Sequence, residues 1–157
     1  MINCEFEDGG KAKLRHVTTD VIVVKDGKIL MVRRNQKLLE GGKWGLAGGF
    51  MDRDETVAQC ATREVYEETG WEIQGLTLLT IVDGPDRPHE DRQNVSFVYF
   101  CEAVQKTGEP DWESDAVEWF GLDDLPPDEQ IAFDHAKSIG LYKKYLTDNL
   151  PLPILSA

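Results

Sequence analysis

Two apolar segments of extended character lie near the start of the chain. Residues 16–24 (HVTTDVIVV) are rich in β-branched side chains, which favour strands. The pair Asp26-Gly27 follows, and it favours a tight turn because glycine readily adopts a positive φ. Residues 28–33 (KILMVR) then return as a second apolar segment, so the pattern predicts a β-hairpin. Residues 1–14 are polar, contain glycine and indicate no regular element.

Strand-like segments continue after a polar loop. Residues 44–50 (WGLAGGF) are apolar but interrupted by glycine, which predicts a short strand that runs into a loop. Three more strands are predicted from apolar, β-branched and aromatic runs at residues 76–82, 95–104 and 117–122. A twelve-residue polar loop, residues 83–94, separates the first two of these strands. Loops of that length are uncommon in compact domains and are often functional.

The clearest helical pattern lies between Thr56 and Gly70. Thr56 with Gln59 fits a capping box, which satisfies free N–H groups at a helix start, and Gly70 is a common helix stop. At about 100° per residue, four apolar side chains fall on one arc that should face a sheet. Those side chains are Val57, Ala58, Ala61 and Val65.

A second helix is predicted over residues 128–148, after the helix-breaking pair Pro126-Pro127. Strands with one helix between them and another at the end predict an α/β fold, in which a mixed β-sheet lies between helices. A length of 157 residues corresponds to a single domain, spanning residues 1–157, with a core large enough to need no disulfide.

Three carboxylates crowd into the last turn of the first helix. Glu64, Glu67 and Glu68 lie where a helix presents its partially negative end, although acids are favoured at the opposite end. Glu68 also falls on the apolar arc, where an unpaired carboxylate is costly to bury. The cluster is either a solvated acidic face or a site for a divalent cation, and its placement favours the cation. Three carboxylates and a backbone carbonyl form a hard oxygen site suited to Mg²⁺ or Mn²⁺.

The residues around this cluster support the cation. Gly48 and Gly49 allow the loop before the helix to approach it closely and to turn a carbonyl toward it. Arg63 is expected to pair with a neighbouring acid such as Glu55, which would hold the cluster in shape.

Composition limits the classes of binding partner that we expect. A net charge of -12 argues against a nucleic acid or an anionic membrane as the main partner. It would also repel a phosphorylated substrate, unless a metal ion or local Arg and Lys residues reverse the field. Three distant cysteines show no zinc spacing or disulfide pattern, which favours a reducing compartment. No stretch approaches the roughly 20 apolar residues of a membrane span, so we expect a cytoplasmic protein.

Residues 49–71 resemble the Nudix box, the signature of the Nudix hydrolases. Gly49 is followed after five residues by Glu55, and after seven more by Arg63-Glu64-Val65. The remaining fixed positions are Glu67, Glu68 and Gly70. Two positions depart from the common pattern: Trp71 replaces an aliphatic residue, and Ala47 replaces the proline of the usual Leu-Pro-Gly-Gly lead-in. Neither departure touches an expected ligand.

The resemblance implies a Nudix fold, an α/β/α sandwich, and metal-dependent hydrolysis of a nucleoside diphosphate linked to another moiety. By motif position, Glu64 and Glu68 would be the principal ligands of Mg²⁺ or Mn²⁺. Glu67 would be a further ligand or would hold water, and the Gly49 carbonyl would complete the shell. Glu55 and Arg63 would form a supporting ion pair. By family analogy alone, a homodimer is one option for the oligomeric state.

Family members often recruit another catalytic acid from a loop outside the box. The candidates are four acids in the loop before Trp119, and we favour Glu113 because of its distance from the following strand. A flexible acidic loop without a catalytic role is the alternative. The four candidates are Glu109, Asp111, Glu113 and Asp115.

The substrate is indicated by residues 83–99, which are similar to the region after the box in ADP-ribose pyrophosphatases. Arg87 or Arg92 could neutralise a phosphate, or each could be a surface arginine without a role. Trp44 and Phe50 could stack a base or belong to the core. We predict cleavage of ADP-ribose to AMP and ribose 5-phosphate. The alternatives are a (d)NTP pyrophosphohydrolase of the nucleotide-pool cleansing type and a non-catalytic nucleotide-sensing Nudix-like protein.

Overall fold

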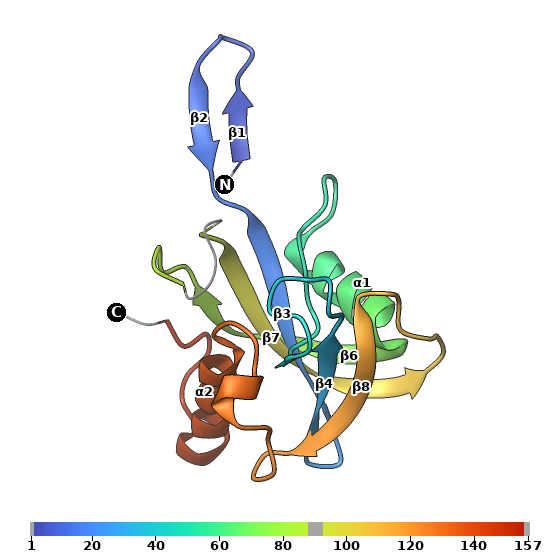
Figure 1. The fold of residues 1–157 in the computed structure, drawn as a ribbon. Coiled ribbons are helices and arrows are strands. Elements are labelled where there is room, and N and C mark those ends of the chain that lie inside the picture. The colour runs from blue at the N-terminus through green and yellow to red at the C-terminus, as the bar shows by residue number, and fades with distance from the viewer. Residues whose placement is uncertain (1, 88–92, 156–157) are drawn as a thin grey trace.

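The structure of the protein is a computed structural model that describes residues 2–87 and 93–155. Its centre is a six-stranded sheet with the order β5-β4-β3-β7-β6, in which β8 pairs with β4 (Figure 1). Among the described residues, β3 and β7 are the parallel pair and the other pairs of this sheet are antiparallel. The strands are β3 (Val17–Lys25), β4 (Lys28–Arg34), β5 (Trp44–Gly45), β6 (Trp71–Val82), β7 (Val95–Lys106) and β8 (Ser114–Gly121).

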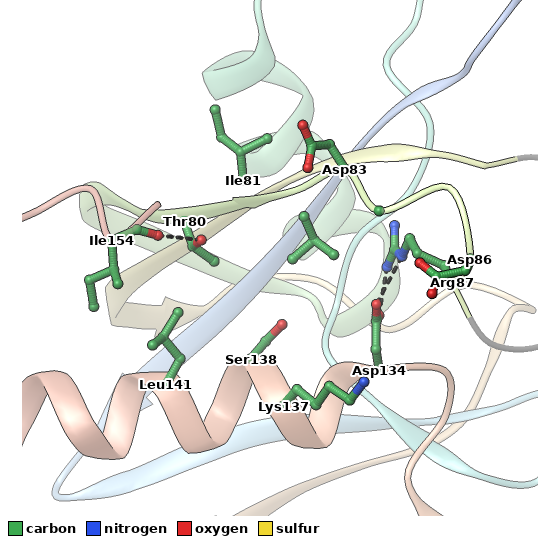
Figure 2. A pocket seen from close by; sticks show the side chains of 12 residues that line it. Thr80, Ile81, Asp83, Asp86, Arg87, Asp134, Lys137, Ser138, Leu141 and Ile154 are labelled. Atoms are coloured by element: carbon green, nitrogen blue, oxygen red, sulfur yellow. Dashed lines mark hydrogen bonds and ion pairs between the residues drawn. The ribbon is translucent and has the colours of Figure 1, made fainter. Parts of the chain in front are cut away.

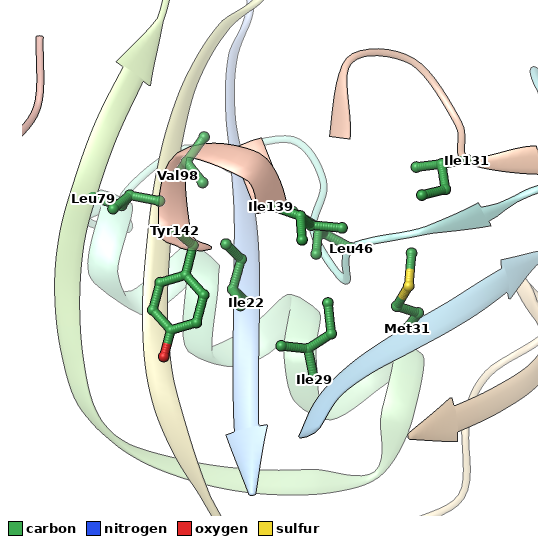
Figure 3. Packing of buried hydrophobic residues seen from close by; sticks show 9 residues of the cluster. All are labelled: Ile22, Ile29, Met31, Leu46, Leu79, Val98, Ile131, Ile139 and Tyr142. Carbon is green, nitrogen blue, oxygen red and sulfur yellow. The ribbon is translucent and has the colours of Figure 1, made fainter. Parts of the chain in front are cut away.

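Helices cover both faces of the sheet, α1 (Val57–Thr69) on one side and α2 (His135–Asp148) on the other. Because side chains alternate along a strand, β3 contributes to two cores. Val21 and Val23 pack with α1, whereas Ile22 packs with α2. Figure 3 shows the second core, where Ile139 and Tyr142 of α2 meet the sheet. The predicted α/β/α sandwich with a mixed sheet is therefore confirmed.

The first predicted hairpin is present as β3 and β4. Asp26 and Gly27 both have positive φ, at 50° and 74°, as a tight hairpin turn requires. The turn pairs Lys25 with Lys28 and Val23 with Leu30. The register places the two apolar segments side by side, as the sequence pattern predicts.

Helix α1 also begins and ends as predicted. The Thr56 side chain accepts the Gln59 N–H, the Gln59 side chain accepts the Thr56 N–H, and Gly70 ends the helix with a φ of 73°. Ala61 and Val65 are buried as expected, although Ala58 in the first turn is exposed. The chain enters β6 directly at Trp71, five residues before the predicted strand start. Gly75, whose φ is 68°, lies within a register shift there, which hid the first half of this strand in the sequence.

The second helix is shorter than predicted. Residues 128–130 form a separate 3₁₀ turn, η1 (Asp128–Gln130), and α2 begins at His135. Between them, Ile131 forms a bridge with Trp44, and the Ala132 N–H donates to the Trp44 carbonyl at 2.7 Å. Phe133 then takes a φ of 52°. Pairing with the sheet edge thus replaces the first helical turns.

Residues 2–14, where no element was predicted, form an antiparallel hairpin of β1 (Ile2–Glu5) and β2 (Lys11–Leu14). This N-terminal hairpin is a sheet of its own and projects from the rest of the molecule (Figure 1). No helix within residues 2–87 and 93–155 has the length and apolar character needed to span a membrane.

Candidate active site

The loop before α1 lies directly against the acidic end of this helix. The Gly48 N–H donates to Glu68 at 3.0 Å. A Cβ at Gly49 would lie 2.5 Å from the carboxyl carbon of Glu64, and a Cβ at Gly48 would collide with the Thr19 carbonyl of β3. Gly48 therefore needs to be glycine because it meets backbone, whereas a side chain at Gly49 would displace the Glu64 carboxylate, and the close approach expected from the sequence is present.

Glu68 is the deeply buried member of the cluster, with 5% of its surface exposed. Burial, the strongest influence, raises the pKa of this carboxyl to about 8, and the Gly48 N–H opposes the rise. The nearby charges of Glu64 and Glu113 raise the pKa further, and Arg34 lowers it. A carboxyl in this setting resists ionisation unless a cation approaches.

Arg63 binds the other acids of the cluster. Its guanidinium makes two hydrogen bonds with Glu55, at 2.7 and 3.1 Å, which is the predicted ion pair. It also binds Glu64 at 2.8 Å and Glu67 at 3.0 Å. The hydrogen bonds from Arg63 lower the pKa of Glu55 to about 2. Within residues 2–87 and 93–155, no three acidic, His or Cys side chains are gathered in the form of a metal cluster.

The chemical character of these donors nevertheless fits a hard divalent cation. Carboxylate oxygens are the preferred ligands of Mg²⁺ and Mn²⁺. Among the described residues, no ion pair joins the buried Glu68 to a cation, whereas Arg63 binds Glu55. Glu64 and Glu67 would have to turn from Arg63 to join it. At present the Arg63 guanidinium bridges the Glu64 and Glu67 carboxylates.

The backbone oxygen predicted for this site already has two donors, one of them the Cys60 thiol at 4.0 Å. The Gly49 carbonyl accepts the Thr19 N–H at 3.0 Å, which ties the loop to β3. Within the described residues, no hydrogen bond to the Gly48 carbonyl is found. Gly48 therefore offers a backbone oxygen that the sequence did not single out, one residue before the predicted one.

The loop after β7 carries Glu113 toward the cluster. The N–H groups of Thr107 and Gly108 donate to the Gly70 carbonyl, and the Asp111 N–H donates to the Glu67 carbonyl. Glu113 raises the pKa of both Glu64 and Glu68, so its charge acts on the acidic helix end. The three other acids of the loop have their own partners. Glu109 binds Lys106, Asp111 accepts the Glu113 N–H, and Asp115 accepts from Asn35.

A cavity of about 330 Å³ opens beside the Gly48-Gly49 loop and Glu113. Its polar lining includes both acidic and basic side chains, and its apolar lining includes Phe50, which is 40% exposed. Trp44, the other aromatic residue predicted to stack a base, is not part of the lining. Trp44 packs against Phe120 with ring centres 4.9 Å apart and joins the core beside α2.

Arg87 lines this cavity but is held by an acid. Its guanidinium binds Asp134 through two hydrogen bonds of 2.7 and 2.9 Å, and 8% of its side chain is exposed. Figure 2 shows this ion pair at one end of a second cavity, of about 500 Å³, between the end of β6 and α2. Arg92, the other loop arginine considered as a phosphate ligand, lies outside the described residues.

Arg34, which the sequence analysis did not select, is a second cation at the first cavity. Its Nε donates to the Leu39 carbonyl at 2.9 Å, and its guanidinium lies 5.0 Å from the centre of the Phe133 ring. Arg33 and Arg34 are adjacent in the sequence, and only the register of β4 decides which of them faces the cavity. Arg33 is exposed.

A buried polar network forms another part of the cavity wall. Asp20 of β3 accepts a hydrogen bond from the Ser96 hydroxyl and lies 3.3 Å from Nε2 of His135. Nδ1 of His135 accepts the Leu46 N–H at 2.9 Å, so the ring proton of a neutral imidazole lies on Nε2, facing Asp20. Burial raises the pKa of Asp20, but His135, Ser96 and Arg87 together outweigh it and lower the pKa overall. The sequence offered no spacing signal for this network.

Comparison with known proteins identifies the family. The NUDIX domain model matches residues 14–142. The chain is 33% identical to the ADP-ribose pyrophosphatase of Methanocaldococcus jannaschii over 129 residues, which cover 82% of this chain and 73% of that protein. The extent of one domain over residues 1–157 stays a prediction.

Two solved structures share the fold. One is the Nudix domain of Shewanella oneidensis NrtR complexed with ADP ribose, with a TM-score of 0.72, 27% identity, and coverage of 86% of this chain and 90% of that one. The other is a Francisella tularensis bifunctional NMN adenylyltransferase/ADP ribose pyrophosphatase complexed with AMP and a Mn ion. Its TM-score is 0.68 at 25% identity, covering 87% of this chain and 42% of that one. With the intact box at the acidic end of α1, these matches show that the chain belongs to the Nudix family and is a Nudix hydrolase.

Proposed function

We propose that this Nudix hydrolase is a divalent-metal-dependent pyrophosphohydrolase that cleaves a nucleoside diphosphate linked to another moiety. Our best candidate for the substrate is ADP-ribose, which would give AMP and ribose 5-phosphate. The observation that carries the proposal is the position of Glu68. It is a buried carboxyl with a pKa near 8, beside Glu64 and Glu113 and close to a cavity of about 330 Å³.

Mg²⁺ or Mn²⁺ would be held by Glu64, Glu67 and Glu68, with a backbone carbonyl of the Gly48-Gly49 loop. A bound metal ion of this kind polarises a phosphate and lowers the pKa of an attacking water. Arg63 positions Glu64 and Glu67, and Glu55 in turn holds Arg63. The ion pair thereby keeps Glu64 and Glu67 beside Glu68, from where they would turn toward a bound cation.

The cavity side chains supply the remaining roles. The Arg34 guanidinium binds a phosphate of the substrate, because it is fixed by the Leu39 carbonyl and the Phe133 ring at the cavity wall. Glu113 lines the cavity, its charge acts on Glu64 and Glu68, and its carboxylate accepts a proton from the attacking water. Phe50, partly exposed in the same cavity, offers a ring face for a base or sugar.

The choice of ADP-ribose rests on likeness to relatives. The Methanocaldococcus jannaschii relative is an ADP-ribose pyrophosphatase, and the NrtR domain was complexed with ADP ribose. Arg87, the loop arginine used in the sequence argument, is engaged with Asp134 and supports this choice less than expected. A (d)NTP pyrophosphohydrolase remains the alternative that a substrate panel must test.

The test is hydrolysis of ADP-ribose by the purified chain, followed as AMP release with Mg²⁺, with Mn²⁺ and with EDTA. We expect activity with either metal and none with the chelator. Glu68→Gln should lower kcat by at least about a hundredfold, because it removes the charge that would bind the metal. Asp54→Asn is the matched control, since Asp54 is an exposed acid of the same motif that pairs with Arg53.

Three outcomes would contradict the proposal. Equal rates for the wild type and Glu68→Gln would end the catalytic assignment, and activity that survives EDTA would end the metal dependence. A (d)NTP preferred over ADP-ribose by a wide margin in kcat/KM would replace the substrate while leaving the reaction type intact.

A further inference from the structure

Arg15, which lies between β2 and β3, binds backbone carbonyls at both described ends of the polar loop between β6 and β7. Its Nη2 donates to the Asp83 carbonyl at 2.6 Å and to the Gly84 carbonyl at 3.4 Å, directly after β6. Nη2 also donates to the Asn94 carbonyl at 3.2 Å, and Nε donates to the Gln93 carbonyl, directly before β7. One side chain therefore joins the two ends of this loop.

The strand order explains how Arg15 reaches both loop ends. β3 and β7 run parallel, and the Val95 N–H at the beginning of β7 donates to the His16 carbonyl at 2.8 Å. β6 pairs with β7 on its other side, where Val82 lies opposite Ser96. Arg15 thus extends from the beginning of β3 across the beginning of β7 to the end of β6. A guanidinium suits this position because its planar fork offers several donors in fixed directions, whereas an ammonium is a point charge.

The backbone of Gln93 shows that one loop end is held in a costly conformation. Gln93 has a φ of 53°, in the left-handed region that residues other than glycine rarely adopt. In this conformation its carbonyl accepts the bond from Arg15. A hydrogen bond from a charged donor is stronger than one from a neutral donor, so it offsets part of this cost.

Both loop ends belong to the wall of the cavity of about 330 Å³. Arg87 follows Asp83 in the first loop end (Figure 2), and it lines this cavity together with the buried Asn94 of the second loop end. Among the described residues that line the cavity, Arg15 is not included. Any effect of Arg15 on a bound ligand must therefore pass through the residues of the loop ends.

The segment that carries Arg15 also contacts Phe50, which lines the same cavity. The His16 ring lies edge-on to the Phe50 ring, with ring centres 5.1 Å apart. The Met51 N–H donates to the Val17 carbonyl at 3.0 Å. The beginning of β3 therefore connects two parts of the cavity wall that are distant in the sequence.

From these contacts we propose that Arg15 is a positioning residue for substrate binding, which holds the loop ends so that Arg87 and Asn94 keep their places in the cavity. The inference rests on the proposed function, because that function assigns the cavity to the substrate. The carboxylates proposed to hold the metal, those of Glu64 and Glu68, belong to α1, whereas Arg15 binds the loop ends. Loss of Arg15 thus weakens substrate binding and leaves the metal site intact.

Steady-state kinetics with ADP-ribose and Mg²⁺ test this role. Arg15→Ala should raise the KM by about tenfold and leave kcat within about twofold, because the loop ends lose their shared donor. Arg15→Lys should give an intermediate KM, since it keeps the charge without the fork of donors. Lys13→Ala is the matched control, because it removes an exposed positive charge two residues away, and its KM should equal that of the wild type. An unchanged KM in Arg15→Ala, or a loss of kcat as large as the loss of kcat/KM, would overturn the proposal.

Hydrogen exchange measures the contact between Arg15 and the loop ends independently of activity. In Arg15→Ala the Val95 amide, which is bound to the His16 carbonyl beside the loop end, should exchange at least about tenfold faster than in the wild type. The Cys60 amide within α1 should exchange at the wild-type rate. Equal exchange of Val95 in both proteins would overturn the proposal. A wild type that does not hydrolyse ADP-ribose would contradict the proposed function instead, and the exchange rates would still decide whether Arg15 holds the loop ends.

Discussion

Glu68 and Asp20 are two buried carboxyls on either side of the Gly48-Gly49 loop, and their ionisation is shifted in opposite directions. They are 5% and 9% exposed. Burial raises the pKa of Glu68 to about 8, whereas His135, Ser96 and Arg87 bring the pKa of Asp20 below its usual value. The two carboxyls are similarly buried, so the opposite pKa shifts come from the groups that surround each of them. A carboxyl with dedicated donors stabilises the fold, and one that faces other acids marks a site for a cation.

Isosteric replacements of the two acids give the largest expected contrast. Glu68→Gln should stabilise the protein in EDTA, because the folded pKa near 8 exceeds the unfolded value of 4.5. Between pH 4.5 and 8 the folded state keeps a proton on Glu68 that the unfolded chain releases, so this residue costs stability progressively as the pH rises, by up to about 3 kcal/mol at pH 7. Asp20→Asn should instead cost about 2 kcal/mol, because it weakens charge-assisted hydrogen bonds from His135 and Ser96.

Urea unfolding at pH 7 in EDTA measures both free energies. Glu109→Gln is the control, because Glu109 is an exposed acid whose partner is Lys106, and it should leave the stability unchanged within about 0.5 kcal/mol. Loss of stability in both Glu68→Gln and Asp20→Asn would show that the two carboxyls play the same structural part.

The pH dependence of metal binding is a second test of the difference between Glu68 and Asp20. Below pH 8 the folded Glu68 carries a proton that a divalent cation must displace. The apparent affinity for Mg²⁺ should therefore rise with pH by up to about tenfold per unit between pH 6 and 8, and then level off. Titration calorimetry of the wild type and Glu68→Gln checks this. A pH-independent affinity, or an unchanged slope in the variant, would remove Glu68 from the metal site.

Arg34 should give the smallest of the three effects. Arg34→Ala removes a positive charge that favours ionised Glu68. The pH at which the Mg²⁺ affinity levels off should therefore move upward. The KM for ADP-ribose should rise by about tenfold, because a fixed phosphate donor is lost. Arg33→Ala, which changes the exposed neighbour, should alter neither quantity. Identical results for the two variants would place the phosphate elsewhere in the cavity.

The parts of the fold that were predictable carry their signals locally. The turn at Asp26-Gly27, the cap at Thr56 and the stop at Gly70 each need only a few neighbouring residues. The N-terminal hairpin carried such a signal too, because its apolar positions alternate. Its many charges and glycines outweighed that alternation, and β1 and β2 were missed.

The parts that were missed depend on contacts between distant segments. Asp20 meets Ser96 and His135 only because β3 pairs with β7 and α2 begins beside them. Arg34 was missed for the same reason, because only the register of β4 in the sheet decides that its side chain faces the cavity. Arg87 was selected as a phosphate ligand, but its bond to Asp134 could be seen only in three dimensions. The acids could be identified from the box motif, whereas the cavity beside them could be identified only from the tertiary structure.

The loop carrying Glu113 is bound to the last turn of α1 by three backbone hydrogen bonds, from Thr107, Gly108 and Asp111. This attachment makes the helix end and the loop one mechanical unit, so Glu113 moves with Glu64 and Glu68 and not against them. Thermal motion should therefore displace the acids together and preserve their spacing. Amide hydrogens at Thr107, Gly108 and Asp111 should accordingly exchange with deuterium at the rate at which the end of α1 opens.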